Sequence, residues 1–415
     1  MSGASSAAGG SSRLWEIDAL RGLMLVLMTL THVPTRFSSP AGQPFGYVSA
    51  AEGFVLLSAF MAGWIYTARQ LKDGVERMRL AFLKRVAKIY LSQTALLLFV
   101  FTAVSVVGVV AQQPAITNLL SFYLEHPVQA IAGSLLLVYN PPLLDILPMY
   151  ILFMLASPLV LVVGGRRGWG AMMGASVALW LGAQFGLGRV LYDGVVATTE
   201  FVIPFAETGA FDILAWQMLW MIGLWMGAMH AAGRRPGPFP GWLVAAAALI
   251  GATGFVWRHA VGQAPFGGNA ALDPLFDKWA LGPLRILDLF ALLILTMHFA
   301  PWLRGRLPRV RALEVLGAAS LPVFCIHLVI ALMALAIFGE ASDTRSWFVD
   351  VAILAAAFAV LYAVALISGQ IDRHSAAVRA AFAAKQAARA KARAGDAVSA
   401  GAPRSPTSRS RSPPR

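Results

Sequence analysis

Residues 313–338 read LEVLGAASLPVFCIHLVIALMALAIF, and beyond Glu314 this stretch contains no Asp, Glu, Lys or Arg. A helix rises ~1.5 Å per residue, so a run of this length can cross the ~30 Å hydrocarbon core of a membrane. Similar apolar runs recur along the 415-residue chain, in which 58% of residues are hydrophobic and only 13% are charged. A soluble domain carries about a quarter charged residues. The sequence therefore predicts an all-α, polytopic membrane protein.

We expect about ten transmembrane helices from these apolar runs. They cover residues 18–35, 49–68, 86–110, 145–164, 170–189, 212–231, 240–257, 284–303, 313–338 and 347–370. The segment 114–140 is also apolar, but Glu125, His126 and Pro127 interrupt it. We interpret it as an interfacial or re-entrant segment, and counting it as a span would make eleven.

Basic residues gather in every second connection of this arrangement and in the C-terminal part of the chain. Because cytoplasmic connections are enriched in Lys and Arg, we expect both the N- and the C-terminus to be cytoplasmic. This distribution also explains the net charge of +13, and no basic nucleic-acid-binding motif accompanies it. We therefore expect the lipid bilayer, and no nucleic acid, as the partner of the basic surface.

The chain divides into three regions by composition. We expect a disordered N-terminal tail at 1–15 and a transmembrane domain at 16–372. The region 373–415 is rich in Ala, Arg, Ser and Pro and shows no apolar periodicity, so we expect a basic, disordered cytoplasmic tail.

The first span, EIDALRGLMLVLMTLTHVP (16–34), carries the clearest set of polar residues. Arg21 and His32 are eleven positions apart, which places them on one helix face and ~16 Å apart along the axis. Asp18 lies one turn before Arg21 and can pair with it. Ionisable groups inside a membrane are costly and mark functional sites, although an ordinary interfacial ion pair at Asp18 and Arg21 stays an alternative.

Three further residues are candidates for contact with His32. By the same helical rise, His327 lies at a depth similar to that of His32, although a simply packed histidine is an equal alternative. Glu52 and Asp145 each lead directly into an apolar helix, and either carboxylate can orient the His32 imidazole for acid–base catalysis. The histidines show no metal-ligand spacing, so we expect no metal site.

The motif of the first span is followed in order by further motifs along the membrane portion: AEGFVLLSAF (51–60), AFLKRVAKIY (81–90), DILPMY (145–150), AWQ (215–217), LRIL (284–287) and LGAASLPVFC (316–325). In this order, and with Arg21 and His32 separated by ten residues, the chain resembles the acyltransferase-3 superfamily. It resembles most closely the OpgC branch, the succinyltransferases of osmoregulated periplasmic glucans. The sequence departs from that branch at His327 and at Ala318–Ala319, which leaves the acyl group and the acceptor open.

The resemblance implies a membrane O-acyltransferase of the bacterial inner membrane. Its donor would be acyl-CoA, with succinyl-CoA favoured and no tightly bound cofactor, and its acceptor a periplasmic glucan or another glycan. We expect the catalytic residues to be His32, Arg21, Glu52 and Asp145. We expect substrate contacts from a second set, with Arg285 a candidate for stabilising the oxyanion: Asp18, Trp216, Gln217, Arg285 and His327.

Two other classes of function remain open from the sequence. A transporter or flippase with a proton-relay cavity would also place histidines and acids inside the membrane. A membrane protein with a purely structural role is the third alternative. The absence of a visible internal repeat disfavours the transporter, and the presence of both Arg21 and His32 disfavours the structural role.

Overall fold

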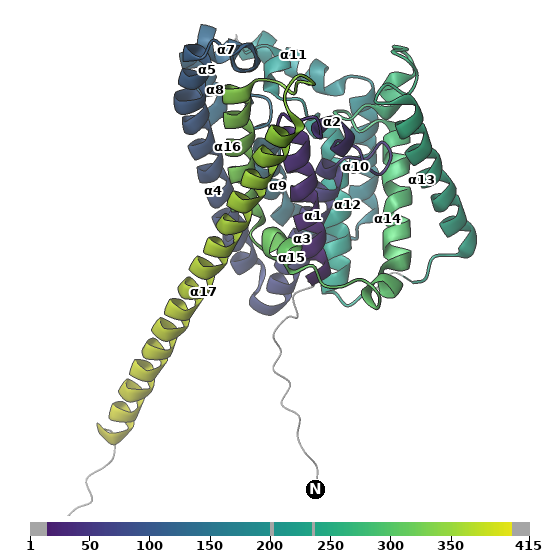
Figure 1. The fold of residues 1–415 in the computed structure, drawn as a ribbon. Helices are drawn as coiled ribbons and strands as arrows, with labels where there is room; N and C mark the ends of the chain where they lie inside the picture. Colours follow the sequence, from purple (N-terminus) through teal and green to yellow (C-terminus); the bar gives the residue numbers. More distant parts are fainter. Residues whose placement is uncertain (1–14, 200–202, 235–236, 401–415) are drawn as a thin grey trace, which may run out of the picture. The chain divides into compact units, whose positions relative to one another are not determined.

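The computed structural model describes residues 15–199, 203–234 and 237–400. Within these residues the chain forms helices and turns and no strand (Figure 1), which confirms the all-α prediction. Eight helical segments of this part are long and apolar enough to cross a membrane. They are Ala50–Asp73 (α3), Val75–Val110, Ile146–Arg167 (α9), Phe205–Ala231, Gly241–Val261 (α13), Pro283–Arg304 (α14), Ser320–Phe338 (α16) and Trp347–Gln386.

Several of these segments contain more than one element. Val75–Val110 consists of α4 (Val75–Phe99), a π-helical turn η1 (Val100–Val104) and α5 (Ser105–Val110). The 3-10 turn η2 (Phe205–Thr208) precedes α12 (Ile213–Ala231), and the last segment belongs to α17 (Trp347–Ala400). A ninth span is formed if α10 (Gly170–Gln184) and α11 (Leu187–Thr199), which are bent by 80°, count as one.

The first predicted span corresponds to α1 (Trp15–His32), which is not among these segments. Its first two turns carry three charged residues, Glu16, Asp18 and Arg21. With these charges the 18-residue helix is too polar to count as a membrane span. The prediction of about ten spans is therefore higher than the eight or nine observed among the described residues. The predicted span 313–338 is also interrupted, because one residue, Ala319, separates α15 (Arg311–Ala318) from α16.

The segment 114–140 forms three short helices, none of which is long enough to span a membrane. They are α6 (Pro114–Leu119), α7 (Ser121–Glu125) and α8 (Pro127–Leu135). Pro127 begins α8, where its missing N–H costs nothing. The position of segment 114–140 at the membrane interface stays a prediction. Two further short elements, α2 (Ser38–Ala41) and η3 (Asp273–Phe276), lie in the connections.

Glycines allow two pairs of helices to approach closely. A Cβ at Gly22 of α1 would lie 2.0 Å from the carbonyl oxygen of Leu313, and one at Gly317 of α15 would lie 1.8 Å from that of Asp18. A Cβ at Gly227 of α12 would likewise lie 2.0 Å from the carbonyl of Phe60 in α3. Small residues of this kind drive helix packing in membranes, where apolar burial between helices gains little. These contacts hold α1 against α15 and α3 against α12 (Figure 1).

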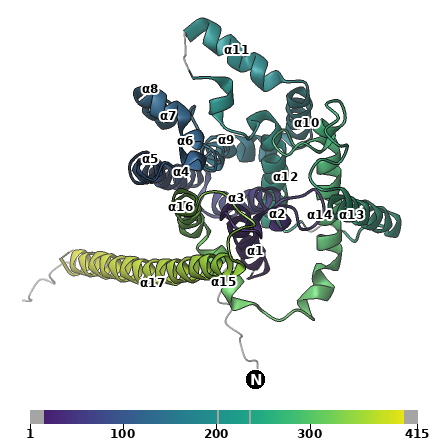
Figure 2. The same cartoon turned by 45° about the horizontal axis from the view of Figure 1, so that its top comes forward.

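The helices around α1 come from distant parts of the chain. α1 packs on α3, α15 and α16, and α16 also contacts α4. The view in Figure 2 shows α1, α3 and α16 as neighbours, while α13 and α14 form a separate pair. This arrangement brings α1 into contact with α16, although some 290 residues of the chain separate the two helices.

The chain forms two compact units, Met1–Ala365 and Leu366–Arg415. In the second unit α17 stays helical as far as Ala400. This differs from the disorder predicted for 373–415, because the Ala-rich segment there also contains Lys, Arg and Gln, which are good helix formers. Residues 1–14 and 401–415, the other parts of the two predicted tails, lie outside the described residues.

Candidate functional site

Two histidines from different helices meet at the end of α1. His32 is the last residue of α1, and His327 lies within α16. The Nδ1 atom of His32 lies 3.0 Å from the Nε2 atom of His327. The two rings are stacked, with centroids 5.3 Å apart and an interplanar angle of 21°. His327 is fully buried and His32 is half-buried, so the histidines predicted at similar depth form a pair.

The partners of His327 determine where the protons of the pair lie. The Nδ1 atom of His327 lies 2.6 Å from the carbonyl oxygen of Phe324. Because a carbonyl oxygen can only accept, this Nδ1 is the donor, and in a neutral imidazole the Nε2 atom is then the acceptor. His32 consequently donates through its Nδ1–H to His327. The Nε2 atom of His32 is left with its lone pair, which is the form that a general base requires.

A buried cluster fixes the segment directly after His32. Asp350, at the start of α17, is fully buried. Its Oδ2 atom accepts hydrogen bonds from the backbone N–H and the Nε–H of Arg36, each at 3.1 Å. Its Oδ1 atom lies 2.8 Å from the Nε of Arg345, whose Nη2 also donates to the carbonyl of Pro34. The end of α1 is therefore held against the beginning of α17.

Arg21 lies at the junction of α1, α15 and α16. Its Nη2 donates to the hydroxyl of Ser320, the first residue of α16. Its Nη1 lies 3.9 Å from the Oδ1 of Asp18, which is buried. The guanidinium also faces the ring of Phe54, with its central carbon 5.9 Å from the ring centroid. The predicted pairing of Asp18 with Arg21 is thus present, and Ser320 is a partner that the sequence did not indicate.

A cavity of about 290 Å³ opens beside Arg21. Its polar lining comes from α1, α3, α4, α9 and α16, namely from Arg21, Ser58, Tyr66, Arg85, Tyr150 and Ser320. Phe324 also lines this cavity. The ring centroid of Phe324 lies 4.8 Å from that of His327 and 5.8 Å from that of Phe54. Phe324 therefore lies in the lining of the cavity and also against the ring of His327.

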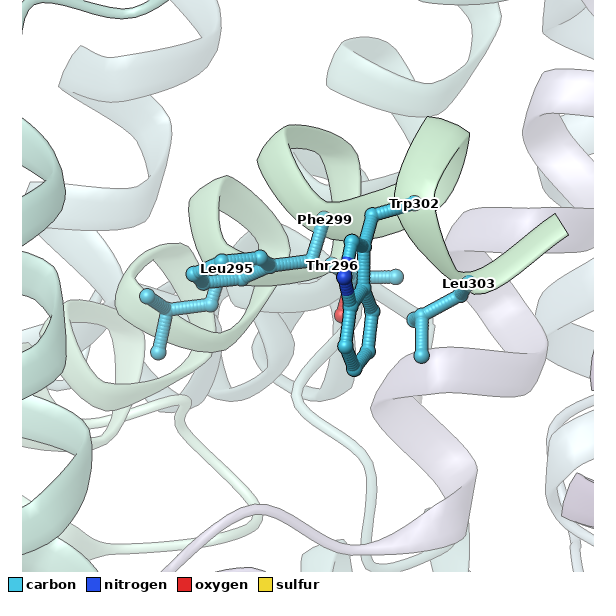
Figure 3. Close-up of a pocket in the computed structure, with 5 residues that line it drawn as sticks. All are labelled: Leu295, Thr296, Phe299, Trp302 and Leu303. Atoms are coloured by element: carbon cyan, nitrogen blue, oxygen red, sulfur yellow. The ribbon is translucent and has the colours of Figure 1, made fainter. Parts of the chain in front are cut away.

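A second hollow, of about 450 Å³, lies along α14 (Figure 3). It is lined by Leu295, Thr296, Phe299, Trp302 and Leu303. The hydroxyl of Thr296 donates to the carbonyl of Leu292 in the same helix, at 2.7 Å. No ionisable side chain lines this hollow, so it offers no acid–base chemistry and we place the candidate site at the cavity beside Arg21.

Glu52 does not orient His32. In the described structure its carboxylate accepts from the backbone N–H of Ser49 at 3.1 Å and from the Ser49 hydroxyl, which completes a capping box at the start of α3. Its other oxygen pairs with the Nε of Arg285. Both partners are almost fully buried, so the charge of Glu52 is already balanced by Arg285.

Asp145 does not contact His32 within the described structure either. Its Oδ2 atom accepts a hydrogen bond from the backbone N–H of Ala210 at 2.9 Å. The residue precedes α9 and is only 7% exposed, and burial raises the pKa of its carboxyl group to about 6. The prediction that Glu52 or Asp145 orients the imidazole is therefore wrong, because other donors engage both carboxylates. The side chain that contacts the His32 imidazole is His327.

Trp216 and Gln217 serve packing between helices. Trp216 is fully buried, and its Nε1–H donates to the carbonyl of Trp279 at 2.9 Å. The side chain of Gln217 accepts from the hydroxyl of Ser176 at 2.7 Å and donates to the Ser176 carbonyl at 2.8 Å. Trp216 is therefore closed to a sugar, and the Gln217 amide is bonded to Ser176 of α10 and to Leu214 of its own helix. The substrate contacts predicted for these two residues are not supported.

Lys278, in the loop before α14, is a half-buried lysine that the sequence did not single out. Its charge acts on His32, Glu52, Asp145 and Arg285. Burial lowers the pKa of its ammonium group. Its neighbours along the chain, Asp277 and Trp279, are typical of a surface loop, and its ammonium group lies 4.5 Å from the centroid of the Trp279 ring. Within the described ranges, no three His, Cys, Asp or Glu residues are close enough together to hold a metal ion.

Comparison with known protein families gives one match. A family described as "OpgC protein" matches residues 13–373, which is most of the chain. Comparison with curated proteins and with solved structures found no match. The family match includes every residue of the candidate site and agrees with the resemblance drawn from the ordered motifs. The chain belongs to the OpgC family.

Proposed function

We propose that this protein is a membrane O-acyltransferase. It transfers an acyl group, with succinyl favoured, from cytoplasmic acyl-CoA to a hydroxyl of a periplasmic glucan or another glycan, and it resides in the bacterial inner membrane. Membership of the OpgC family supports a glucan acyltransferase-like function. The observation that carries the proposal is the hydrogen bond from His32 to His327, which leaves the His32 Nε2 atom unprotonated.

In the proposed reaction His32 is the general base. Its Nε2 atom takes the proton from a sugar hydroxyl as the hydroxyl oxygen attacks the thioester carbonyl. Collapse of the tetrahedral intermediate breaks the C–S bond, and the proton passes from His32 to the departing thiolate. The products are the sugar ester and free CoA thiol. His327 contributes by holding the His32 ring and by accepting from its Nδ1–H throughout.

The proposed donor site is the cavity beside Arg21. Two guanidinium groups, those of Arg21 and Arg85, line it and match the phosphates of CoA. Helix α1 is continuous between Arg21 and His32, so the two side chains are ~16 Å apart along its axis. The extended pantetheine arm of CoA suits that distance and would carry the thioester toward His32.

Phe324 has two roles in this account. Its carbonyl accepts from His327 and fixes the tautomer. Its ring lines the cavity and packs against His327, and we propose that the acyl chain passes this ring to reach His32. The ring of Phe54 beside it narrows the same passage.

The test compares glucans from cells that produce the wild-type protein, His32→Ala or His298→Ala. His298 is an exposed histidine of α14 and serves as the matched control. We expect mass spectrometry to find acyl-substituted glucan with the wild type and with the control, and none with His32→Ala at equal protein level in the membrane. Unchanged substitution with His32→Ala would exclude the proposed reaction. Glucan that changes its location without any covalent change would support the transporter instead.

A further inference from the structure

The apolar hollow along α14 runs toward the end of that helix where arginines gather. Its lining residues extend from Leu295 to Leu303 (Figure 3), and α14 ends at Arg304. The helical rise between the first and the last lining residue is roughly 12 Å. One leaflet contributes about 15 Å, which is half of the ~30 Å hydrocarbon core. An acyl chain of a single leaflet can therefore lie along this hollow for most of its length.

The walls of the hollow are apolar and face away from the rest of the chain. Phe299 is 44% exposed and Trp302 is 54% exposed. Thr296 is exposed as well, but its hydroxyl already donates to the carbonyl of Leu292 at 2.7 Å. An exposed apolar surface of this kind indicates contact with a partner or with lipid.

A basic segment follows the hollow directly. It reads RGRLPRVR (304–311) and holds four arginines in eight residues. The Nε atom of Arg304 lies 2.9 Å from the Oε1 atom of Glu16. The Nε atom of Arg309 lies 3.8 Å from the Oε1 atom of Glu314. The two other arginines of the segment have no carboxylate partner among the described residues, so the segment keeps a net positive charge.

Arg306 connects this basic segment to the hollow. Its central guanidinium carbon lies 4.5 Å from the centroid of the Trp302 ring, which is one wall of the hollow. The side chain is exposed, and neither an ion pair nor a hydrogen bond is found for it in the described part of the chain. A guanidinium stacked on an aromatic face keeps its N–H donors available, and their geometry matches phosphate oxygens. A phosphate at Arg306 and an acyl chain in the hollow can belong to one phospholipid.

We propose that the hollow along α14 binds one acyl chain of an anionic phospholipid whose phosphate contacts Arg306. The pattern of basic residues predicts that this end of α14 faces the cytoplasm, and the cytoplasmic leaflet carries anionic lipid. A zwitterionic phospholipid has the same phosphate, but the positive charge of 304–311 repels its ammonium group. Phosphatidylglycerol should therefore bind better than phosphatidylcholine. This binding is separate from acyl transfer, because the cavity beside Arg21 shares no lining residue with the hollow.

The test uses the full-length protein in phosphatidylcholine vesicles with a trace of a photoactivatable phospholipid. The probe is either phosphatidylglycerol or phosphatidylcholine, with the same diazirine-bearing acyl chain. We expect mass spectrometry of the peptides to find phosphatidylglycerol cross-linked to residues 295–303 about fivefold more than phosphatidylcholine. Arg306→Gln should remove most of this preference. Arg77→Gln removes an exposed arginine of α4 and should leave the preference unchanged.

A second variant tests the hollow itself. Thr296→Trp fills the hollow and leaves the basic segment intact, so it should lower the cross-linking of both lipids at 295–303. Equal capture of the two lipids by the wild type, or a preference that Arg306→Gln does not change, would overturn the role of Arg306. Cross-links that avoid 295–303, or that persist there in Thr296→Trp, would overturn the placement of the acyl chain. The two substituted side chains are exposed, so the midpoint of thermal unfolding should match that of the wild type.

Discussion

The Nδ1 atom of His32 donates to the Nε2 atom of His327 over 3.0 Å, and the direction of this bond is set by the carbonyl of Phe324 on the far side of His327. A histidine thus takes the place that a carboxylate holds in many hydrolytic triads. Because a neutral imidazole is a weaker acceptor than a carboxylate, the pair favours the neutral form of His32. That form is the one required to accept a proton from a sugar hydroxyl.

Replacing His327 should reduce the rate more than the binding of the donor. In His327→Ala the His32 ring loses the acceptor that fixes its tautomer, and we expect kcat to fall by about 100- to 10,000-fold. The KM for acyl-CoA should change little, because the proposed CoA site lies beside Arg21. His327→Gln offers a side-chain oxygen to His32 and should recover part of kcat. Steady-state kinetics in membranes provides the measurement, and an effect confined to KM would contradict the assigned role.

Replacing Arg21 should mainly weaken the binding of the acyl-CoA donor. Arg21→Lys keeps the charge but loses the forked geometry that reaches both Ser320 and a phosphate. We expect the KM for acyl-CoA to rise by about tenfold or more, while its dependence on ionic strength stays the same because the charge is kept. Arg79→Lys, in an exposed pair with Glu76, is the matched control. A KM for Arg21→Lys equal to that of the control would remove Arg21 from the donor site.

The acyl passage proposed at Phe324 can be tested by enlarging this side chain and varying the length of the acyl chain. Phe324→Trp enlarges the side chain between the cavity and His327, so we expect donors with long acyl chains to lose more activity than acetyl-CoA. The backbone carbonyl that accepts from His327 is retained in this variant, which separates the passage from the tautomer. Measuring kcat/KM over a series of acyl-CoA chain lengths decides the point. An equal loss at every length would show that the ring does not border the acyl path.

The buried pair of Glu52 and Arg285 should contribute to stability. Glu52→Gln leaves the Arg285 guanidinium buried without its counter-charge, which costs about 3 to 5 kcal/mol. Glu76→Gln breaks an exposed pair with Arg79 and should cost little. Thermal unfolding in detergent compares the two variants. Equal midpoints would contradict the structural role assigned to Glu52.

The carboxyl group of Asp145 should make stability depend on pH. Its pKa is raised from 3.8 to about 6 by burial, so between these values the folded protein binds a proton that the unfolded chain releases. This contribution therefore falls as pH rises from about 4 to about 6, and it is constant above that window. Asp145→Asn keeps an oxygen that can accept from Ala210 and should flatten the dependence. An equally steep dependence in Asp145→Asn, measured against the exposed control Asp193→Asn, would assign it to another group.

The sequence predicted the helices well, because apolar runs and charge clusters are local features. It also placed His32 and His327 at similar depth, since the rise of a helix converts residue number into height. It did not predict that the two rings touch, because no local pattern states which helices are neighbours. The close approach at Gly22 and Gly317 that brings α1 to α15 became visible only once the backbones were placed.

The errors at the candidate site share a physical cause. Glu52 was predicted to be catalytic because it leads into an apolar helix, and Trp216 was predicted to contact substrate. Tertiary partners engage both of them, Arg285 in one case and the Trp279 carbonyl in the other. Lys278 was missed for the opposite reason. Lys278 lies in a loop, where a lysine is usually solvated. That it forms no ion pair within the described structure can be seen only from the fold.

We propose that His32 catalyses transfer between a donor and an acceptor on opposite sides of the membrane. The most direct measurement uses sealed inside-out vesicles loaded with glucan, with radiolabelled succinyl-CoA added outside. We expect labelled glucan inside vesicles that contain the wild-type protein, and none with His32→Ala. Labelled glucan at equal levels with His32→Ala, or label that enters the vesicles without joining the glucan, would contradict it.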